Sequence, residues 1–444
     1  MKIIIAGSGE VGTHLAKLLS REDQDIVLID TNEEKLSTLD ADFNIMTKVG
    51  SPTSLNDLKD AGVKGADLFI AVTPDESRNI TAAILAAKLG VTKTLARIEN
   101  EEYLTRENRE LFEKLGVNAF IYPELLAAVE IAGSLNRPWV RQWWELENGE
   151  LYLIGIKVRS NARICDKPLY QLTQKEPYFH IVAIKRGSNT IIPRGTDSVL
   201  NNDIVYFTVL PDRVEHLRDL CGKVDTEVRN VLIMGGSRIA IKATQLMPSR
   251  TKVKLIEANR EKSFKLVERM KNVTIINGDG RNLDLLREEG IKEADAFIAL
   301  SDNSETNILA CVTAKRFGVQ KTVAEVEDID YIDIAERLDI GTVINKKILA
   351  ASKIYQFLLD TDVSNIKCLT FANAEVAELI AKKNSKITRA KIKDLDLPKD
   401  ITLGGLVRDK KAIIVTGDTQ IQEGDTVVVF FLGTAINKIE KYFN

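Results

Sequence analysis

The chain has 444 residues, of which 44% are hydrophobic and 28% are charged, and its formal net charge is -3. This length predicts about two to four domains. A near-neutral chain lacks the positive field that nucleic-acid binding needs, so we expect no nucleic-acid partner. No apolar run reaches the roughly 20 residues of a membrane span, and the first apolar run breaks at Gly7, unlike a signal peptide.

Cysteine and histidine are scarce in this sequence. The four cysteines lie far apart with no paired spacing, which predicts no cysteine zinc site and fits a reducing cytoplasm: Cys165, Cys221, Cys311 and Cys368. The three histidines are His14, His180 and His216. Since much hydrolytic and hydride-transfer chemistry uses a histidine, this scarcity argues mildly against an enzyme.

The first hundred residues alternate short apolar runs with helical patterns. The predicted strands cover residues 3–5, 26–29 and 68–72, and the predicted helices cover residues 11–20, 33–39 and 77–89. Continuous apolar strands that alternate with helices are typical of a parallel sheet covered on both faces.

A glycine-rich loop, GSGEVG, follows the first predicted strand and opens the first predicted helix. In this GxGxxG pattern Gly7 allows a tight turn, Gly9 lets the backbone approach a pyrophosphate, and Gly12 lets the helix pack closely on the strand. Asp30 ends the second predicted strand, where an acid accepts hydrogen bonds from a ribose 2′-OH and repels a 2′-phosphate. The pattern therefore predicts binding of NAD(H) or another adenosine nucleotide, and not of NADP.

Further polar residues follow the other strands, where ligands bind in open α/β sheets. Gly50 and Ser51 follow the third strand, and the segment Thr73, Pro74, Asp75, Glu76 follows the fourth, with Asn79 one helical turn beyond. Arg97 ends the fifth strand and is a candidate phosphate partner. The alternatives are a salt bridge for Arg97 and simple helix capping for Asp75 and Glu76.

The sequence then changes character. A predicted helix over residues 124–135 leads to all three tryptophans, Trp139, Trp143 and Trp144, which either pack onto a neighbouring domain or contact a partner protein. Residues 184–207 predict a strand–turn–strand pattern in which the acidic turn residue Asp203 precedes a β-branched run.

The whole arrangement occurs twice. A shift of 228 positions places Gly7 on Gly235, Asn79 on Asn307 and the segment 60–100 on 288–328, with predicted strands at 231–234, 253–256 and 296–300. A helix at 346–359 and a strand–turn–strand segment at 406–429, with Asp425 in its turn, complete the second copy. We expect four domains at residues 1–123, 140–224, 229–345 and 362–444. The predicted fold class is α/β, with two Rossmann-like doubly wound parallel sheets, each followed by a small β-rich α+β domain.

The second glycine loop departs from the pattern. Gly235 keeps the first glycine, but Ser237 and Ala240 replace the second and third, and Ser237 would crowd a pyrophosphate. Glu257 stands where Asp30 stood, and Glu325 reverses the charge of Arg97. Arg238 could compensate as a phosphate contact, so nucleotide binding and a structural or allosteric role both remain open for this loop.

No catalytic set is visible. The sequence has no Ser-His-Asp order, no metal-ligand cluster and no GxxxxGK[ST] motif, and none of the histidines is placed as an acid or base beside the loop. We therefore predict no catalytic residues and no metal, and a sensor is favoured over an NAD-dependent oxidoreductase.

These motifs together resemble the regulatory subunits of Trk-type potassium uptake systems, which consist of two tandem RCK units (regulators of potassium conductance). The resemblance covers essentially the whole chain and depends on KIIIAGSGEVGTHLAKLL, LIDTNEEKL, ADLFIAVTPDESRN, LARIEN and the duplication. It implies a cytosolic, non-enzymatic subunit that assembles as a homo-oligomer, a tetrameric ring or a dimer. The subunit would lie peripherally at the inner face of the plasma membrane, below a TrkH-like potassium-translocating partner.

The resemblance also implies nucleotide sites for NAD(H), with ATP and ADP as further candidates. The first site would use residues in the first half of the chain: Gly7, Ser8, Gly9, Glu10, Val11, Asp30, Ser51, Thr73, Pro74 and Arg97. The second would use their counterparts: Gly235, Gly236, Ser237, Arg238, Ile239, Glu257, Asp279, Leu300 and Ser301. A nucleotide sensor for another membrane transporter or channel is an alternative within the same fold.

Overall fold

The computed structural model describes residues 1–20, 24–37, 45–172, 177–358, 363–368, 374–432 and 436–443. The chain divides into two compact units. The first unit contains Met1–Leu126 and Lys346–Asp360, and the second contains Ala127–Asn345 and Thr361–Asn444. The ends of the predicted helices at residues 39 and 359 lie outside the described residues.

The first unit is built on a six-stranded parallel sheet with the order β3-β2-β1-β4-β5-β6. Its strands are β1 (Lys2–Ala6), β2 (Asp25–Asp30), β3 (Ile45–Val49), β4 (Leu68–Ala71), β5 (Lys93–Arg97) and β6 (Ala119–Ile121). The helices between them are α1 (Glu10–Ser20), α2 (Glu33–Ser37), α3 (Leu55–Asp60), α4 (Glu76–Lys88) and α5 (Arg106–Leu115). This is the Rossmann strand order. The chain adds β2 and β3 on one side of β1 and then β4, β5 and β6 on the other, so a ligand site is expected at the carboxyl ends of β1 and β4, where the order changes side.

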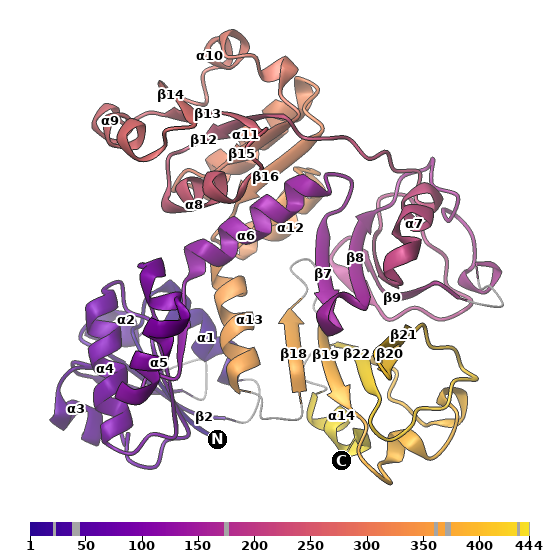
Figure 1. Ribbon diagram of the computed structural model, residues 1–444, viewed down its shortest axis with the longest axis horizontal. Helices are drawn as coiled ribbons and strands as arrows, with labels where there is room; N and C mark the ends of the chain where they lie inside the picture. Colours follow the sequence, from indigo (N-terminus) through magenta and orange to yellow (C-terminus); the bar gives the residue numbers. More distant parts are fainter. Residues whose placement is uncertain are drawn as a thin grey trace. The chain divides into compact units, whose positions relative to one another are not determined.

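The centre of this sheet is its core. Ile3, Ile4 and Ile5 of β1 and Phe69 and Ile70 of β4 are fully buried, because helices cover both faces of the sheet (Figure 1). Burying each of these side chains contributes roughly 1.5–3 kcal/mol. This core fixes the strand ends that carry the glycine loop.

One helix of the first unit comes from far along the chain. Helix α13 (Lys346–Leu358) packs against α1 and β6 of the first sheet domain (Figure 1). The corresponding helix in the first half of the chain, α6 (Pro123–Asn136), belongs mostly to the second unit.

The second unit begins with a five-stranded antiparallel sheet of order β10-β9-β11-β8-β7. Its elements are β7 (Gln142–Leu146), β8 (Leu151–Lys157), β9 (Phe179–Arg186), β10 (Asn189–Ile191), β11 (Ile204–Val209) and α7 (Val214–Leu220). Trp139 and Trp143 pack against its hydrophobic core, and Trp144 is buried in β7. His180 lies inside β9.

A second six-stranded parallel sheet follows with the order β14-β13-β12-β15-β16-β17, the same topology as the first. Its strands are β12 (Asn230–Met234), β13 (Lys252–Glu257), β14 (Val273–Asn277), β15 (Ala296–Ala299), β16 (Lys321–Glu325) and β17 (Thr342–Ile344). Its helices are α8 (Arg238–Leu246), α9 (Arg260–Arg269), α10 (Leu283–Glu288), α11 (Ser304–Arg316) and α12 (Asp330–Arg337).

The chain ends in a second antiparallel sheet of order β18-β19-β22-β20-β21. Its elements are β18 (Val363–Cys368), β19 (Ala374–Ile380), β20 (Ile401–Arg408), β21 (Lys411–Ile413), β22 (Thr426–Leu432) and α14 (Ile436–Phe443). The two antiparallel sheets touch, since the hydroxyl of Thr208 on β11 donates to the carbonyl of Gly404 on β20 at 2.7 Å. The predicted fold class, with two parallel sheets that are each followed by a β-rich part, is confirmed.

The acidic turn residues of the two β-rich parts are structural. Asp203 is buried, pairs with Arg186 at 2.8 Å and accepts the N–H of Leu200. Asp425 repeats this with Arg408 at 2.6 Å and the N–H of Gln422. A buried carboxylate that is hydrogen-bonded in this way fixes its turn, and both copies of the duplication have the same arginine pair and the same backbone N–H donor.

Candidate functional site

The first glycine loop joins β1 to α1 at the point where the sheet order reverses. Gly7 has a φ of +114°, and a Cβ there would lie 3.0 Å from the Thr73 nitrogen at the end of β4. A Cβ on Gly12 would lie 1.8 Å from the Gly7 carbonyl oxygen, whereas a Cβ on Gly9 would meet no atom within 4 Å. Gly7 and Gly12 therefore close the loop tightly, and Gly9 leaves the outer side of the loop open to a ligand.

Asp30, at the end of β2, fastens this loop. Its carboxylate accepts the backbone N–H of Ser8 at 2.6 Å and that of Asn32 at 2.9 Å. Burial acts to raise the pKa of Asp30, but these two N–H donors outweigh it and hold the pKa below its usual value. The group is therefore an ionised acceptor beside the loop, as recognition of ribose hydroxyls requires.

Asn79 organises the neighbouring strand ends. Its side chain is 1% exposed, accepts the N–H and hydroxyl of Thr73 at 2.9 and 2.6 Å, and donates to the carbonyls of Thr73 and Arg97. Asn79 thus ties the end of β4 to the end of β5. Pro74 lies in the turn between Thr73 and α4.

The remaining strand-end residues have local partners. Ser51, after β3, donates its N–H to Asp57 at 2.8 Å, and its hydroxyl lies 3.0 Å from that of Thr53. Asp75 caps α4 by accepting the N–H of Arg78, as the capping alternative proposes. Glu76 differs, because its carboxylate accepts the N–H groups of Glu99 and Asn100 at 2.8 and 3.0 Å.

Arg97 forms an ion pair, which is one of the two roles expected for it from the sequence, the other being contact with a phosphate. Its guanidinium lies 2.9 Å from the carboxylate of Glu124 on α6 and 3.7 Å from that of Glu99. Glu124 is 6% exposed, and among the described residues neither the Arg97 Nε nor the Glu124 Oε2 has a hydrogen-bond partner. The pair thus contains one N–H donor and one carboxylate acceptor that form no hydrogen bond with the described residues. Glu124 was not predicted for the site, because no motif marks it.

A second residue that the sequence analysis missed is Lys347 on α13. Its ammonium lies 3.3 Å from the carboxylate of Glu10, the fourth residue of the glycine loop. Lys347 is distant in sequence from the loop, so only the folded chain brings the two together. The helix that follows the second parallel sheet therefore contacts the loop of the first.

The second glycine loop has the same anchor. Glu257, at the end of β13, accepts the N–H groups of Gly236 and Asn259 at 2.9 Å each and pairs with Lys262 at 3.0 Å. Burial acts to raise the pKa of Glu257, but these partners hold it below its usual value. Asn307 repeats the role of Asn79, since it binds Ser301 after β15 and the carbonyl of Glu325 on β16.

The outer side of the second loop differs from the first. Ser237 is the N-cap of α8, where its hydroxyl accepts the N–H of Ala240 at 3.3 Å. A Cβ on Gly236 would lie 2.3 Å from the Leu266 side chain, and Asp279 pairs with Arg281 at 2.8 Å. Ile239 and Leu300 are buried in the core. The predicted residues of the second site are close together around a loop whose helix end already has a cap.

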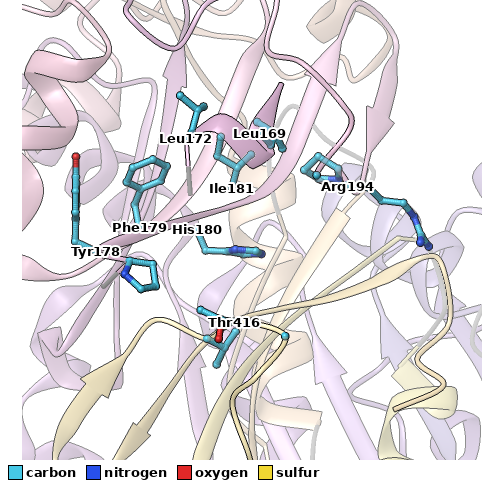
Figure 2. A pocket seen from close by; sticks show the side chains of 13 residues that line it. Leu169, Leu172, Tyr178, Phe179, His180, Ile181, Arg194 and Thr416 are labelled. Atoms are coloured by element: carbon cyan, nitrogen blue, oxygen red, sulfur yellow. The ribbon is translucent and has the colours of Figure 1, made fainter. Parts of the chain in front are cut away.

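His180 belongs to the first antiparallel sheet. His180 lines a cavity of about 270 Å³ between β9 and the turn at Val415, Thr416 and Gly417, together with Tyr178 and Arg194 (Figure 2). Burial lowers the pKa of His180 to about 4, so it is neutral at pH 7. Within the described ranges no three His, Cys, Asp or Glu side chains are grouped to hold a metal, and no helix there is long and apolar enough to cross a membrane.

Comparisons with known proteins cover the full chain. A model of the TrkA-N domain matches residues 3–123 and 231–346, and a model of the TrkA-C domain matches residues 153–222 and 376–444. The sequence is 31% identical to the Trk system potassium uptake protein TrkA of Haemophilus influenzae, over 100% of this chain and 98% of that relative.

Two solved structures have the same fold. The RCK domain of GsuK is similar with a TM-score of 0.64 at 15% identity, over 100% of this chain and 94% of that one. The GsuK channel bound to NAD is similar with a TM-score of 0.63 at 14% identity, over 100% of this chain and 78% of that one.

Proposed function

The chain belongs to the family of the Trk system potassium uptake protein TrkA, and from this premise we propose that it is a nucleotide-binding regulatory subunit of a Trk-type potassium uptake system. It senses NAD(H), ATP or ADP and gates a separate membrane subunit that translocates potassium. The observation that carries this proposal is the first glycine loop, which is open at Gly9 and anchored by the ionised carboxylate of Asp30.

The residues of the first loop fit a dinucleotide. The N-terminus of α1 and the open side of Gly9 suit a pyrophosphate, and Asp30 suits ribose hydroxyls but repels a 2′-phosphate. Arg97, at the end of β5, stays the candidate phosphate partner in addition to its ion pair with Glu124. NAD(H) or an adenine nucleotide is therefore the proposed ligand, and NADP is not.

The second loop has a different proposed role. Because Ser237 already caps α8, we assign this loop to structure or to allosteric coupling in preference to nucleotide binding. The second-site residues, from Gly235 to Ser301, stay a prediction.

Gating requires only that the nucleotide contact two conformations of the subunit unequally. About a tenfold difference in affinity shifts the equilibrium by about 1.4 kcal/mol per site, and a symmetric homo-oligomer multiplies this shift. The ion pair between Lys347 and Glu10 offers a physical link, since α13 leads from the second parallel sheet to the last β-rich part. The subunit would work as a cytosolic ring or dimer at the inner face of the membrane, bound to a TrkH-like partner.

We expect no turnover of a substrate. A dehydrogenase needs an acid or base beside the nicotinamide, and the described residues around the first loop include no histidine other than His14 on α1. Steady oxidation of NADH with a small metabolite would contradict this part of the proposal.

Potassium uptake by cells that lack this protein tests the function. Wild type should restore uptake, and Asp30→Ala should restore it poorly because the loop loses its anchor. Asp25→Ala is the matched control, since Asp25 is an exposed residue at the opposite end of the same strand. Unchanged uptake on deletion, or full rescue by Asp30→Ala, would remove the proposal.

A further inference from the structure

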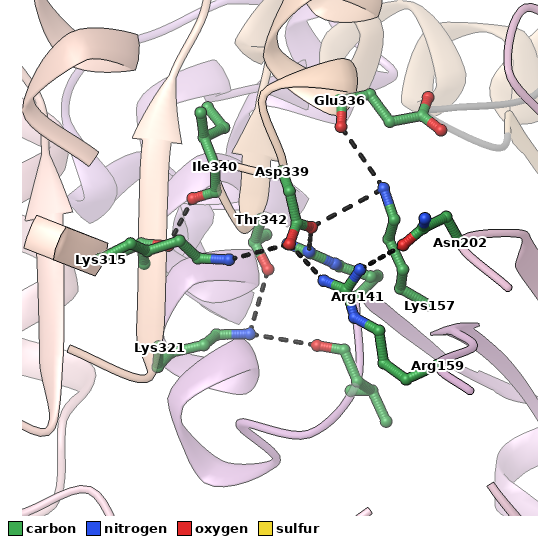
Figure 3. Close-up of polar contacts among 12 residues, drawn as sticks. Arg141, Lys157, Arg159, Asn202, Lys315, Lys321, Glu336, Asp339, Ile340 and Thr342 are labelled. Atoms are coloured by element: carbon green, nitrogen blue, oxygen red, sulfur yellow. Dashed lines mark hydrogen bonds and ion pairs between the residues drawn. The ribbon is translucent and has the colours of Figure 1, made fainter. Parts of the chain in front are cut away.

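The second unit contains a cavity of about 340 Å³ whose walls are strongly cationic. It lies where the first antiparallel sheet meets the second parallel sheet, and Figure 3 shows the polar contacts of five of its cations, Arg141, Lys157, Arg159, Lys315 and Lys321. Six cations line it: Arg141 before β7, Lys157 at the end of β8, Arg159, Lys223 after α7, Lys315 on α11 and Lys321 at the start of β16. The indole-bearing residue Trp139 lines the same cavity.

One carboxylate, Asp339, holds most of these cations together. It pairs with Arg141 and Arg159, and it lies 3.7 Å from the ammonium of Lys157 and 3.4 Å from that of Lys315 (Figure 3). Asp339 follows the C-terminus of α12 with a φ of +54°, a position where the helix dipole disfavours a negative charge. Burial acts to raise the pKa of Asp339, but the surrounding cations lower it to about 2.

Other acids balance only part of the charge of the cavity. Glu336 pairs with Lys185 at 2.8 Å and also attracts Arg141 and Lys157, and Glu130 on α6 attracts Lys321. Lys321 donates instead to the carbonyl of Val140 and the hydroxyl of Thr342. Within the described ranges, Asp339 is the one carboxylate that forms ion pairs with the six cations, and Lys223 forms none.

This imbalance is energetically unfavourable without a ligand. Partly buried charges that lack a counter-charge destabilise a fold by several kcal/mol each. Burial first, and then repulsion by Arg141, lowers the pKa of Lys321 to about 7. Burial, followed by repulsion from Arg159 and Arg141, lowers the pKa of Lys223 to about 8.

We propose that this cavity binds a polyphosphate group, either a free inorganic polyphosphate or the phosphate chain of a nucleotide. The two guanidinium groups of Arg141 and Arg159 match phosphate oxygens in pairs, and the lysines supply further point charges. The site is separate from both glycine loops and does not depend on the function proposed above. A bound anion would connect residues of the first antiparallel sheet with α11 and β16 of the second parallel sheet.

Tryptophan fluorescence of the full chain tests the proposal directly. All three tryptophans lie within residues 139–144, and Trp139 lines the cavity, whereas the first glycine loop belongs to the other unit. Titration with tripolyphosphate should give a saturable change in fluorescence that Gly9→Glu leaves intact. A parallel titration of Gly9→Glu with ATP distinguishes a nucleotide from a free inorganic polyphosphate as the natural ligand. If the cavity is built for a nucleotide, ATP should bind more tightly than tripolyphosphate; if it is built for the polyphosphate alone, ATP should bind no more tightly.

Charge-removing variants locate the binding. Arg159→Gln with Lys223→Gln should weaken tripolyphosphate about 10-fold or more, since each charged hydrogen bond contributes on the order of a tenfold factor. Lys265→Gln with Lys292→Gln is the matched control, because both lysines are exposed and lie outside the cavity. If the double variant is destabilised, Lys223→Gln alone keeps the ion pairs of Asp339 intact and should still weaken binding.

The pH dependence gives an independent check. A bound anion raises the pKa values of Lys223 and Lys321, so binding takes up protons and the affinity rises as the pH falls from about 9 to 7. The other titratable groups that face these lysines are Arg141, Arg159, Asp339 and Cys221 for Lys223, and Arg141, Glu130 and Lys315 for Lys321. Calorimetry in two buffers of different ionisation enthalpy measures the number of protons taken up on binding. No saturable response in wild type, or equal weakening by the control pair, would overturn the site.

Discussion

In the first glycine loop Gly9 stands at the position that Ser237 takes in the second, 228 residues further along the chain. Gly9 has no side chain that could cap α1, whereas the hydroxyl of Ser237 accepts the N–H of Ala240 at the start of α8. A phosphate oxygen binds the same N–H groups of a helix end. The difference teaches that capping and anion binding compete for one set of donors, because a side chain uses one of these donors in the second loop and the residue at the same position in the first loop has no side chain.

The strand ends beside the two loops repeat this contrast. Asn79 and Asn307 make the same hydrogen bonds to the turn after the fourth strand and to the fifth strand of each sheet. The residue whose carbonyl they bind, however, is Arg97 in the first copy and Glu325 in the second. The duplication has kept the groups that hold the backbone and has changed the groups that could contact a ligand.

The largest expected effect comes from breaking the ion pair between Arg97 and Glu124 in the first copy. Arg97→Met leaves the buried carboxylate of Glu124 unpaired, and removal of one partner of a buried pair costs about 3–5 kcal/mol in the free energy of unfolding. Urea unfolding followed by circular dichroism measures this loss. Glu325→Gln, at the matching position of the second copy, isolates what the reversed charge contributes there.

A double variant separates structure from ligand binding at Arg97. Arg97→Met with Glu124→Met replaces both charges by apolar groups and should recover most of the lost stability. NADH affinity should stay low if the guanidinium also contacts phosphate. Full recovery of both stability and affinity would assign Arg97 to the salt bridge alone.

The next effect concerns the third glycine of the loop. Gly12→Ala places a Cβ 1.8 Å from the Gly7 carbonyl, so the loop must move, and we expect a loss of about 1–3 kcal/mol in stability together with loss of NADH binding. Ala240→Gly in the second copy removes a Cβ that the second loop already accommodates, and it should cost at most about 1 kcal/mol. Thermal unfolding and calorimetric titration of both variants measure the contrast. Equal effects would mean that the two loops pack alike.

A smaller effect is expected at the acids that anchor the two loops. Asp30→Asn removes a charged acceptor, which should weaken NADH binding by about 10- to 100-fold. It should also reduce the preference for NADH over NADPH, because the charge that repels a 2′-phosphate is lost. Glu257→Gln should leave both properties unchanged, since the second loop is capped. Weaker NADH binding in Glu257→Gln, at normal stability, would place nucleotide in the second loop.

Sequence patterns could predict the sheets and loops because each is a local signal. The apolar run at residues 3–5, the glycine spacing and Asp30 all lie within one βαβ stretch, and the duplication carries them to the second copy. Glu124 and Lys347 could not be predicted for the site, since each comes from a helix that follows a sheet and reaches the loop region only after folding. The cationic cavity could not be predicted for the same reason, because its six cationic side chains lie between residues 141 and 321 and share no motif.

The smallest predicted effect is the most direct test of the competition between capping and anion binding. Ser237→Gly removes the hydroxyl that caps α8, and replacing a capping side chain by glycine costs only a few tenths of a kcal/mol. The change also restores GxGxxA spacing in the second loop, in which alanine is tolerated at the third position. We therefore expect weak nucleotide binding to appear in this variant, measured by calorimetry in a Gly9→Glu background that silences the first loop.

The matched variant Ser237→Ala distinguishes the two ways in which the serine could block a ligand. Alanine removes the cap but keeps a Cβ in the path of a phosphate, and it costs about 1 kcal/mol because the N–H of Ala240 loses its acceptor. Binding in Ser237→Gly but not in Ser237→Ala would identify crowding by the Cβ as the cause. Binding in both would identify the hydroxyl cap. Binding in neither would show that Ser237 is not what separates the two loops, and would direct attention to the Leu266 side chain, which leaves no room for a Cβ on Gly236.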